Sequence, residues 1–106
     1  MIDMNLIQKV LSTLLTSKHK KQLDITFNHL FEKAQELNLP KRDLSLAKEY
    51  LEHSEYELCL DHMATQFYEF GLSIDVDFYY TINRLSKMMS LPNNTYQYLE
   101  SLILKP

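Results

Sequence analysis

Residues that permit tight turns are scarce in this chain, and this scarcity limits its fold more than any other feature. Among 106 residues there are one glycine, Gly71, and three prolines. β-Hairpins depend on such residues, whereas the abundant Leu, Lys, Glu and Gln favour helix. A content of 45% hydrophobic residues, with five Phe and seven Tyr, is enough for one core. We therefore expect an all-α fold and a single domain over residues 1–106.

Apolar residues recur at three- and four-residue spacing, the pattern of amphipathic helices. Six segments carry such a stripe, and a polar cluster at residues 17–21 separates the first two. Pro40 and Pro92 each stop a segment. The expected helices cover residues 3–16, 23–37, 41–53, 54–71, 75–92 and 94–103. Short connectors between them predict a compact bundle of about six short antiparallel helices.

Several polar residues stand where helix caps are expected. Gly71 suits the left-handed residue that often follows a helix end. Ser54 with Glu57, and more weakly Asn94 with Gln97, have the spacing of a capping box. The other expected caps are Asp3, Asp43, and either Ser73 or Asp75.

The single cysteine, Cys59, excludes an intramolecular disulfide and favours the cytoplasm. The N-terminus has no pattern of an export signal, and no apolar run approaches the ~20 residues of a membrane-spanning helix. We therefore expect a cytoplasmic protein without a membrane association.

Patterns that would support catalysis are weak. Cys59 and His62 have a spacing that could place two metal ligands on adjacent turns, but a closed zinc site needs four ligands. Cys59 lies on an apolar stripe, so a buried core cysteine beside a surface histidine is the preferred interpretation. One glycine cannot form a phosphate-binding loop, and carboxylate pairs such as Glu57 and Asp61 are usual on wet helix faces. We expect no catalytic residue, no metal ligand and no cofactor, and therefore no enzyme.

Charge is distributed unevenly along the chain. Residues 1–48 contain eight basic and five acidic residues, a net +3, whereas residues 49–77 contain eight acidic residues and no Lys or Arg, a net −8. An ordinary solvated helix face mixes the two signs through i,i+4 pairs. The acidic segment would repel nucleic acid and attract a basic surface.

Acidic residues and tyrosines share this segment, and the combination suits a protein interface. A plain solvated surface is the alternative. Tyr56 also lies on an apolar stripe, so a core position is as plausible for it as a contact. The candidate contacts are Glu49, Glu52, Glu55, Tyr56, Glu57, Asp61, Tyr68, Glu69, Asp75, Asp77 and Tyr80.

Part of the chain resembles a known family. The helix-turn-helix AKEYLEHSEYELCL, the junction FYEFGLSID, the run FYYTI and the C-terminal segments LSKMMSLP and YLESLI resemble MafI-type immunity proteins. These are partners of toxins in bacterial polymorphic and contact-dependent growth inhibition systems. The resemblance covers about residues 43–103 and leaves the basic N-terminal helices outside it.

The resemblance implies a protein that binds and neutralises a cognate toxin C-terminal domain in bacterial competition, commonly a ribonuclease of EndoU type. A ribonuclease must be electropositive to hold phosphates, so an acidic helical face could mimic its substrate or block it. The toxin's identity, and inhibition at its active site or at an exosite, stay open. A second hypothesis is a helical chaperone or adaptor that binds a client segment in a groove, where Met63, Met88 and Met89 would serve. A metal-dependent enzyme is the third, and the oligomeric state stays open.

Overall fold

The all-α prediction is confirmed by a computed structural model, which describes the backbone of residues 4–104 and the side chains of Asn5 and residues 17–104. Four α-helices and one 3₁₀ helix follow one another within this part of the chain. They are α1 (Met4–Glu36), α2 (Lys41–Glu52), α3 (Tyr56–Glu69), α4 (Val76–Met88) and η1 (Gln97–Leu102). These five helices are one fewer than the six segments expected, because the first two predicted helices are a single helix. The predicted cap Asp3 lies outside the described residues.

Helix α1 is continuous through the polar cluster at residues 17–21, where we expected a break. The cluster contains no Gly or Pro, and its lysines are good helix formers. What changes there is the side of the helix that carries apolar residues. Phe27, Leu30 and Ala34 are buried in the bundle. The apolar positions Leu11 and Leu14 each lie sixteen residues before Phe27 and Leu30, which corresponds to a rotation of ~160° about the helix axis.

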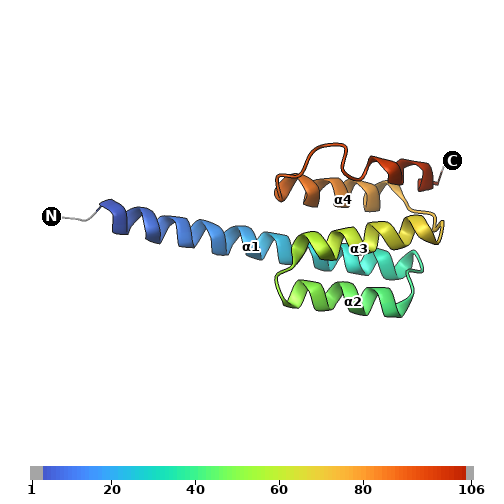
Figure 1. Ribbon diagram of the computed structural model, residues 1–106, viewed down its shortest axis with the longest axis horizontal. Coiled ribbons are helices and arrows are strands. Elements are labelled where there is room, and N and C mark those ends of the chain that lie inside the picture. The colour runs from blue at the N-terminus through green and yellow to red at the C-terminus, as the bar shows by residue number, and fades with distance from the viewer. Residues whose placement is uncertain (1–3, 105–106) are drawn as a thin grey trace.

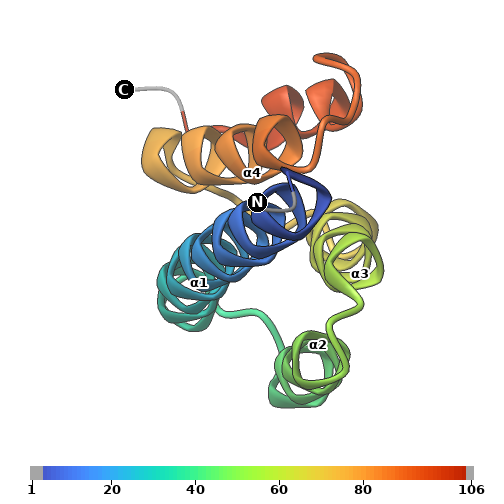
Figure 2. The ribbon, with the colours of Figure 1, turned by 90° about the vertical axis from the view of Figure 1, so that its left-hand side faces the viewer.

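The four α-helices form an up-and-down bundle from which α1 extends (Figure 1). Within the bundle, α1 packs against α2 and α4, α2 packs against α3, and η1 lies on α3. Figure 2, which looks along α1 from its N-terminal end, shows α4 on one side of this helix and α2 on the other. The molecule measures 63 Å along its longest axis and 26 Å across, because the N-terminal half of α1 projects beyond the other helices (Figure 1). The helices thus form a compact all-α bundle, as expected, from which residues 4–21 of α1 project; we call these residues the arm.

All four α-helices end in the same hydrogen-bonded turn, in which a left-handed residue follows the helix. The left-handed residues are Asn38, Ser54, Gly71 and Ser90, with φ between 57° and 73°. At Ser54, for example, the Ser54 amide bonds to the Leu51 carbonyl oxygen and the Glu55 amide to that of Tyr50, both at 2.9 Å. Gly71 is therefore confirmed as a helix end.

The two predicted capping boxes are wrong. Ser54 closes α2 in a left-handed conformation, so it cannot also cap α3, and Glu55 precedes α3 without a side-chain cap. At the C-terminus, the Gln97 amide bonds to the Asn94 backbone carbonyl, and the helix that follows is a short 3₁₀ helix. The Asp75 cap is confirmed, because its carboxylate accepts a hydrogen bond of 2.7 Å from the Phe78 amide.

The core lies between the helices and is mainly aromatic and aliphatic. Phe67 of α3 and Phe78 of α4 pack with ring centroids 4.5 Å apart. Cys59 is fully buried in this core, as expected. Burial raises the pKa of its thiol to about 12, so the thiol is protonated at neutral pH and is a poor nucleophile.

The C-terminal segment is fastened to the connector between α3 and α4. The Leu104 amide donates a hydrogen bond of 2.9 Å to the Ile74 carbonyl oxygen, and the Ile74 amide donates one of the same length to the Leu102 carbonyl oxygen. Ile74 is completely buried. The connector and the chain end therefore close one end of the bundle together. None of the helices in the described residues is long and apolar enough to cross a membrane.

Candidate protein-binding surface

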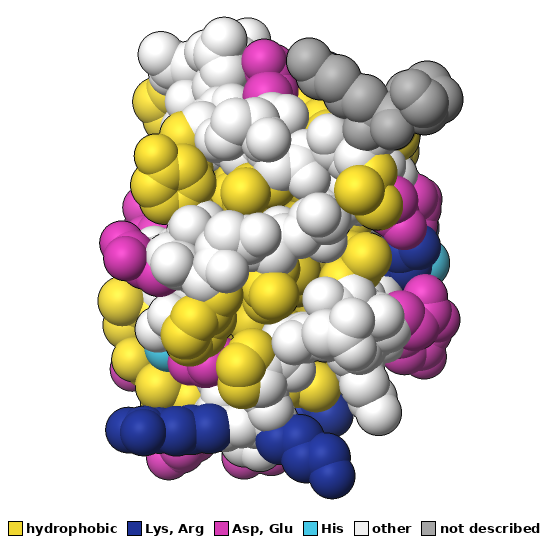
Figure 3. Space-filling view, turned by 90° about the vertical axis from the view of Figure 1, so that its right-hand side faces the viewer, with side chains coloured by type: hydrophobic (Ala, Val, Ile, Leu, Met, Phe, Trp, Pro, Cys, Tyr) yellow, Lys and Arg dark blue, Asp and Glu magenta, His cyan; other side chains and the backbone are white. Residues whose placement is uncertain are grey.

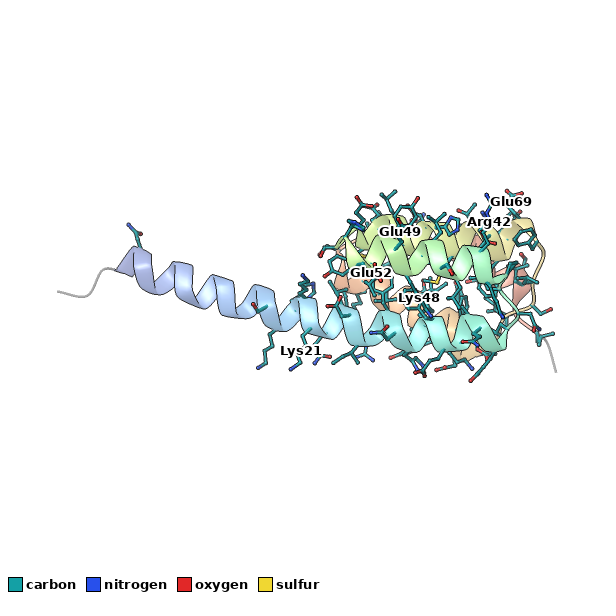
Figure 4. The ribbon with its side chains drawn as sticks, turned by 90° about the horizontal axis from the view of Figure 1, so that it is seen from below. Lys21, Arg42, Lys48, Glu49, Glu52 and Glu69 are labelled. Atoms are coloured by element: carbon teal, nitrogen blue, oxygen red, sulfur yellow. The ribbon has the colours of Figure 1, made fainter. Side chains whose placement is uncertain are left out.

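The eleven candidate contact residues do not share one face. They divide into a group around the turn between α2 and α3, a group where α3 meets η1, and a group on α4. Glu69 stands apart, exposed at the C-terminal end of α3. Figure 4 shows Glu69 at one end of the bundle, with Glu49 and Glu52 nearer the other.

Four exposed glutamates surround the turn between α2 and α3. Since α2 ends where α3 begins, the last turn of one helix and the first turn of the other contribute to the same end of the bundle (Figure 1). This end is also the one from which α1 projects (Figure 1). We call this surface the acidic turn, and it comprises Glu49, Glu52, Glu55 and Glu57.

The pKa of His53 is influenced by three of these carboxylates, which lie near its side chain. Its Nδ1 lies 2.9 Å from the Glu49 carbonyl oxygen. That hydrogen bond is the main reason why the pKa of His53 is raised, and the negative charges of Glu55, Glu49 and Glu52 raise it further. Protonation of His53 would therefore reduce the negative charge of the acidic turn as the pH falls.

Exposed apolar side chains flank the acidic turn. Leu58, in the first turns of α3, is 51% exposed, and Leu46 on α2 is 36% exposed. Leu46, Glu49, Tyr50, His53 and Glu55 line a shallow hollow on the outer side of α2. Within the described residues these four carboxylates form no ion pair, although Lys20 of α1 lines a hollow together with Glu52. Apolar contact area beside such carboxylates is the composition expected of a protein interface with a basic partner.

Tyr56 belongs to the core and not to this surface. Its ring stacks on Phe27 with a centroid distance of 5.9 Å. Its hydroxyl is buried and makes no hydrogen bond of normal geometry within the described residues, although the side chains of Ser54 and Asp24 lie near it. Burial is the main reason why the pKa of Tyr56 is raised. Of the two interpretations that the sequence left open, the structure places Tyr56 in the core.

Asp61 supports the fold through a buried tyrosine. The Tyr96 hydroxyl donates a hydrogen bond to the Asp61 carboxylate, and Tyr96 is 1% exposed. Burial, together with this hydrogen bond, raises the pKa of Tyr96 far above its ordinary value. Asp61 thus holds the C-terminal segment on α3. Beside it, the exposed Tyr68 packs edge-on against Tyr98 at 5.2 Å, and these rings form a second, aromatic surface.

Asp75 and Asp77 are engaged within the molecule. Lys33 of α1 lies 2.6 Å from Asp75 and 3.8 Å from Asp77, and His29 lies 3.3 Å from Asp77. The sequence could not show this compensation, because Lys33 is 42 residues away from Asp75 along the chain. Tyr80 is 65% exposed on the outer side of α4, and α4 lies across the bundle from α2 (Figure 1). These residues are therefore separate from the acidic turn.

Sequence reasoning missed a polar contact between α2 and α3. His62 and Asp43 face each other between α3 and α2, with Nε2 and Oδ1 3.1 Å apart and both side chains largely buried. Asp43 was expected near the start of α2 as a cap, but it links the two helices. His62 was expected at the surface. The spacing of apolar residues, from which the helices were predicted, gives no information on contacts between polar residues of different helices.

No group of three or more His, Cys, Asp or Glu side chains is arranged to hold a metal ion in the described part of the molecule. The end of the bundle opposite to the arm carries apolar side chains among polar ones, with acidic side chains at its sides and near the top of the view and Lys or Arg side chains along the lower edge (Figure 3). Charges of both signs therefore stand at this end. The strongest candidate for a binding surface is therefore the acidic turn with Leu46 and Leu58.

Fold and surface together define a small all-α bundle with an acidic, partly apolar end. Comparisons of the chain with protein-family models, with curated proteins and with solved structures found no match.

Proposed function

We propose that this protein is an immunity protein that binds and neutralises a cognate bacterial toxin domain through the acidic turn. The observation that supports the proposal best is the gathering of four exposed glutamates at one end of the bundle, beside Leu46 and Leu58. The resemblance of residues 43–103 to MafI-type immunity proteins supports it independently. The partner would be a basic domain, and a ribonuclease has the required charge because it must attract phosphates.

Several candidate residues have partners within the molecule, so we leave them out of the proposed contacts with the toxin. Asp75, Asp77 and Asp61 have partners within the bundle, and Tyr56 is in the core. The contacts that we propose are Glu49, Glu52, Glu55 and Glu57, with Leu46 and Leu58 as apolar neighbours. Tyr68 and Glu69 would contribute only if the partner also covers the outer side of α3.

The first experiment tests the function itself. The C-terminal domain of the open reading frame immediately upstream is expressed in a susceptible bacterium, with and without this protein. Growth arrest with RNA cleavage that the protein abolishes is the expected result. A toxin that arrests growth equally in both cultures contradicts the proposal, and capture of an unfolded client segment instead would favour a chaperone or adaptor.

A second experiment tests the surface. The double substitution Glu49→Gln and Glu52→Gln removes two negative charges and should lower the association rate with the toxin about tenfold at low salt, because charge steers the encounter. The matched control is Glu32→Gln with Glu36→Gln, two exposed glutamates near the C-terminal end of α1. Stopped-flow measurements at several salt concentrations compare the variants. Equal losses in both pairs would show that total charge, and not the acidic turn, determines binding.

A further inference from the structure

A polar hollow of about 300 Å³ lies where the arm leaves the bundle, between α1 and the turn from α2 to α3. Lys20, Asp24 and Asn28 follow one another at four-residue spacing, so they stand on one side of α1. The residues that line the hollow are Lys20, Asp24, Asn28, Leu51, Glu52 and Ser54. Residues from two separate parts of the chain therefore build this hollow together.

The side chains that line the hollow carry more negative than positive charge. Asp24 on α1 and Glu52 on α2 contribute two carboxylates, and Lys20 contributes one ammonium group, which gives a net charge of −1. Figure 4 shows Glu52 near the end of the bundle from which the arm projects. The Lys20 side chain is exposed, and among the described residues it forms no ion pair with either carboxylate. Both carboxylates are therefore available to a cation that enters the hollow.

A buried hydroxyl group lies beside the hollow. The hydroxyl oxygen of Tyr56 is buried and has no hydrogen-bond partner of normal geometry within the described residues. Ser54 and Asp24, which both line the hollow, are the polar side chains near it. A buried hydroxyl without a partner costs free energy. A small movement of the Asp24 side chain would let the Tyr56 hydroxyl donate to its carboxylate and so fix the position of that carboxylate in the hollow.

These groups favour a guanidinium group as the ligand. A guanidinium group has five N–H donors in a planar fork, so it can bind two carboxylates at once, and it is less strongly hydrated than an ammonium group. The partly buried Leu51 offers apolar surface to the methylene groups of an arginine side chain. We propose that this hollow binds an arginine side chain of the basic partner, between Asp24 and Glu52. The identity of that partner rests on the proposed function, whereas the binding of a guanidinium group does not.

An NMR titration of the full chain with N-acetyl-argininamide tests the proposal without the toxin. Saturable chemical-shift changes should centre on the backbone amides of Asp24, Asn28, Glu52 and Ser54. The dissociation constant should be on the order of millimolar, because a single side chain buries little surface. N-acetyl-lysinamide should bind more weakly, because an ammonium group lacks the planar fork that reaches both carboxylates. Equal affinity for the two compounds would overturn the choice of a guanidinium group.

Substitutions at the hollow test which groups bind the probe. Asp24→Asn should weaken the binding of N-acetyl-argininamide about fivefold, because it removes one of the two carboxylates. Glu32→Gln is the matched control, since it removes one negative charge from an exposed position of α1 outside the hollow. Tyr56→Phe should weaken binding about twofold without lowering the free energy of unfolding, because the hydroxyl that it removes has no hydrogen-bond partner. The thermal unfolding of each variant shows that the fold is kept.

The sign of the ligand's charge is tested at Lys20. Lys20→Gln should strengthen the binding of N-acetyl-argininamide about twofold, because it removes a like charge from the hollow. Lys21→Gln, at an exposed position that does not line the hollow, is the matched control. Inorganic phosphate is the anionic probe. Phosphate binding in the hollow that Lys20→Gln abolishes would overturn the proposal.

The proposal also fails if Asp24→Asn binds N-acetyl-argininamide as tightly as the wild type does. Its failure is distinguishable from failure of the proposed function. Neutralisation of the toxin in cells, without binding of N-acetyl-argininamide in the hollow, would overturn this inference alone. Binding in the hollow by a protein that does not neutralise the toxin would support the guanidinium site and overturn the proposed function.

Discussion

Single residues in the acidic segment serve the fold and the surface in different ways. Asp61 is acidic and exposed, yet it accepts the hydrogen bond of a buried tyrosine. Glu49 and Glu52 have no comparable structural task among the interactions described. The chemical type of a side chain therefore does not separate a binding residue from a supporting one, and its partner across the fold does.

Asp61→Ala should lower the free energy of unfolding by about 1–2 kcal/mol, because it leaves the buried Tyr96 hydroxyl without its acceptor. The double variant Asp61→Ala with Tyr96→Phe should recover part of this loss, since it removes donor and acceptor together. Urea denaturation measures both. If the double variant has a lower free energy of unfolding than Asp61→Ala, the hydrogen bond does not have the role given to it.

At the level of the element, a single residue at the start of α4 both caps this helix and links it to α1. Asp75 caps the helix at the Phe78 amide and forms an ion pair with Lys33 of α1. Partial burial of Asp75 acts to raise its pKa, but the hydrogen bonds from Lys33 and from the Phe78 amide outweigh this effect, and the pKa of Asp75 is lowered. The Lys33 pKa is correspondingly raised, chiefly by the hydrogen bond to Asp75. One residue thus joins helix capping to the packing of α1 on α4.

Asp75→Asn keeps a capping side chain but removes the charge, so it isolates the ion pair. A lowered pKa in the folded state means that the charged carboxylate stabilises the fold at neutral pH. This stability is lost as the pH falls from the ordinary value of 3.8 through the lower folded pKa. Wild type should be more stable than Asp75→Asn at pH 7, and the difference should shrink below about pH 4. Chemical denaturation at a series of pH values measures it, and a constant difference contradicts the assignment.

At the level of the whole molecule, the bundle and the arm differ in packing. The bundle residues of α1 contribute Phe27, Leu30 and Ala34 to the core, each fully buried. The arm extends past the ends of the other helices (Figure 1). A segment with few packing partners opens locally at low free-energy cost, whereas the core opens only with global unfolding. Residues 17–21, which are all exposed, should therefore open more readily than the bundle.

Limited trypsin digestion of dilute protein tests this difference. Cleavage should come first after Lys18, Lys20 or Lys21, which are exposed residues of the arm. It should leave a resistant fragment that begins just before Leu23 and keeps the bundle's cooperative thermal unfolding. Mass spectrometry identifies the cut sites. Early cleavage within α3 or α4 would show that the bundle is no more stable than the arm.

The sequence by itself determined the fold class and most of the helix positions. Apolar spacing is a local property, so α2, α3 and α4 begin and end close to where they were expected. The sequence also located Gly71 at a helix end and Cys59 in the core, and it limited the cap of α4 to Ser73 or Asp75. A left-handed turn, an apolar stripe and a helix cap are each recognised from neighbouring residues.

Only the tertiary structure decided which residues act together. Ser54 and Ser90 end helices as left-handed residues, a role that glycine usually signals. The change of apolar side along α1 suggested a break, although helix propensity continues through it. Lys33 forms ion pairs with Asp75 and Asp77, while Glu49, Glu52, Glu55 and Glu57 gather at one end of the bundle. Electrostatic interactions act through space, so charges that are uncompensated along the chain are sorted into paired and unpaired groups only when the helices pack.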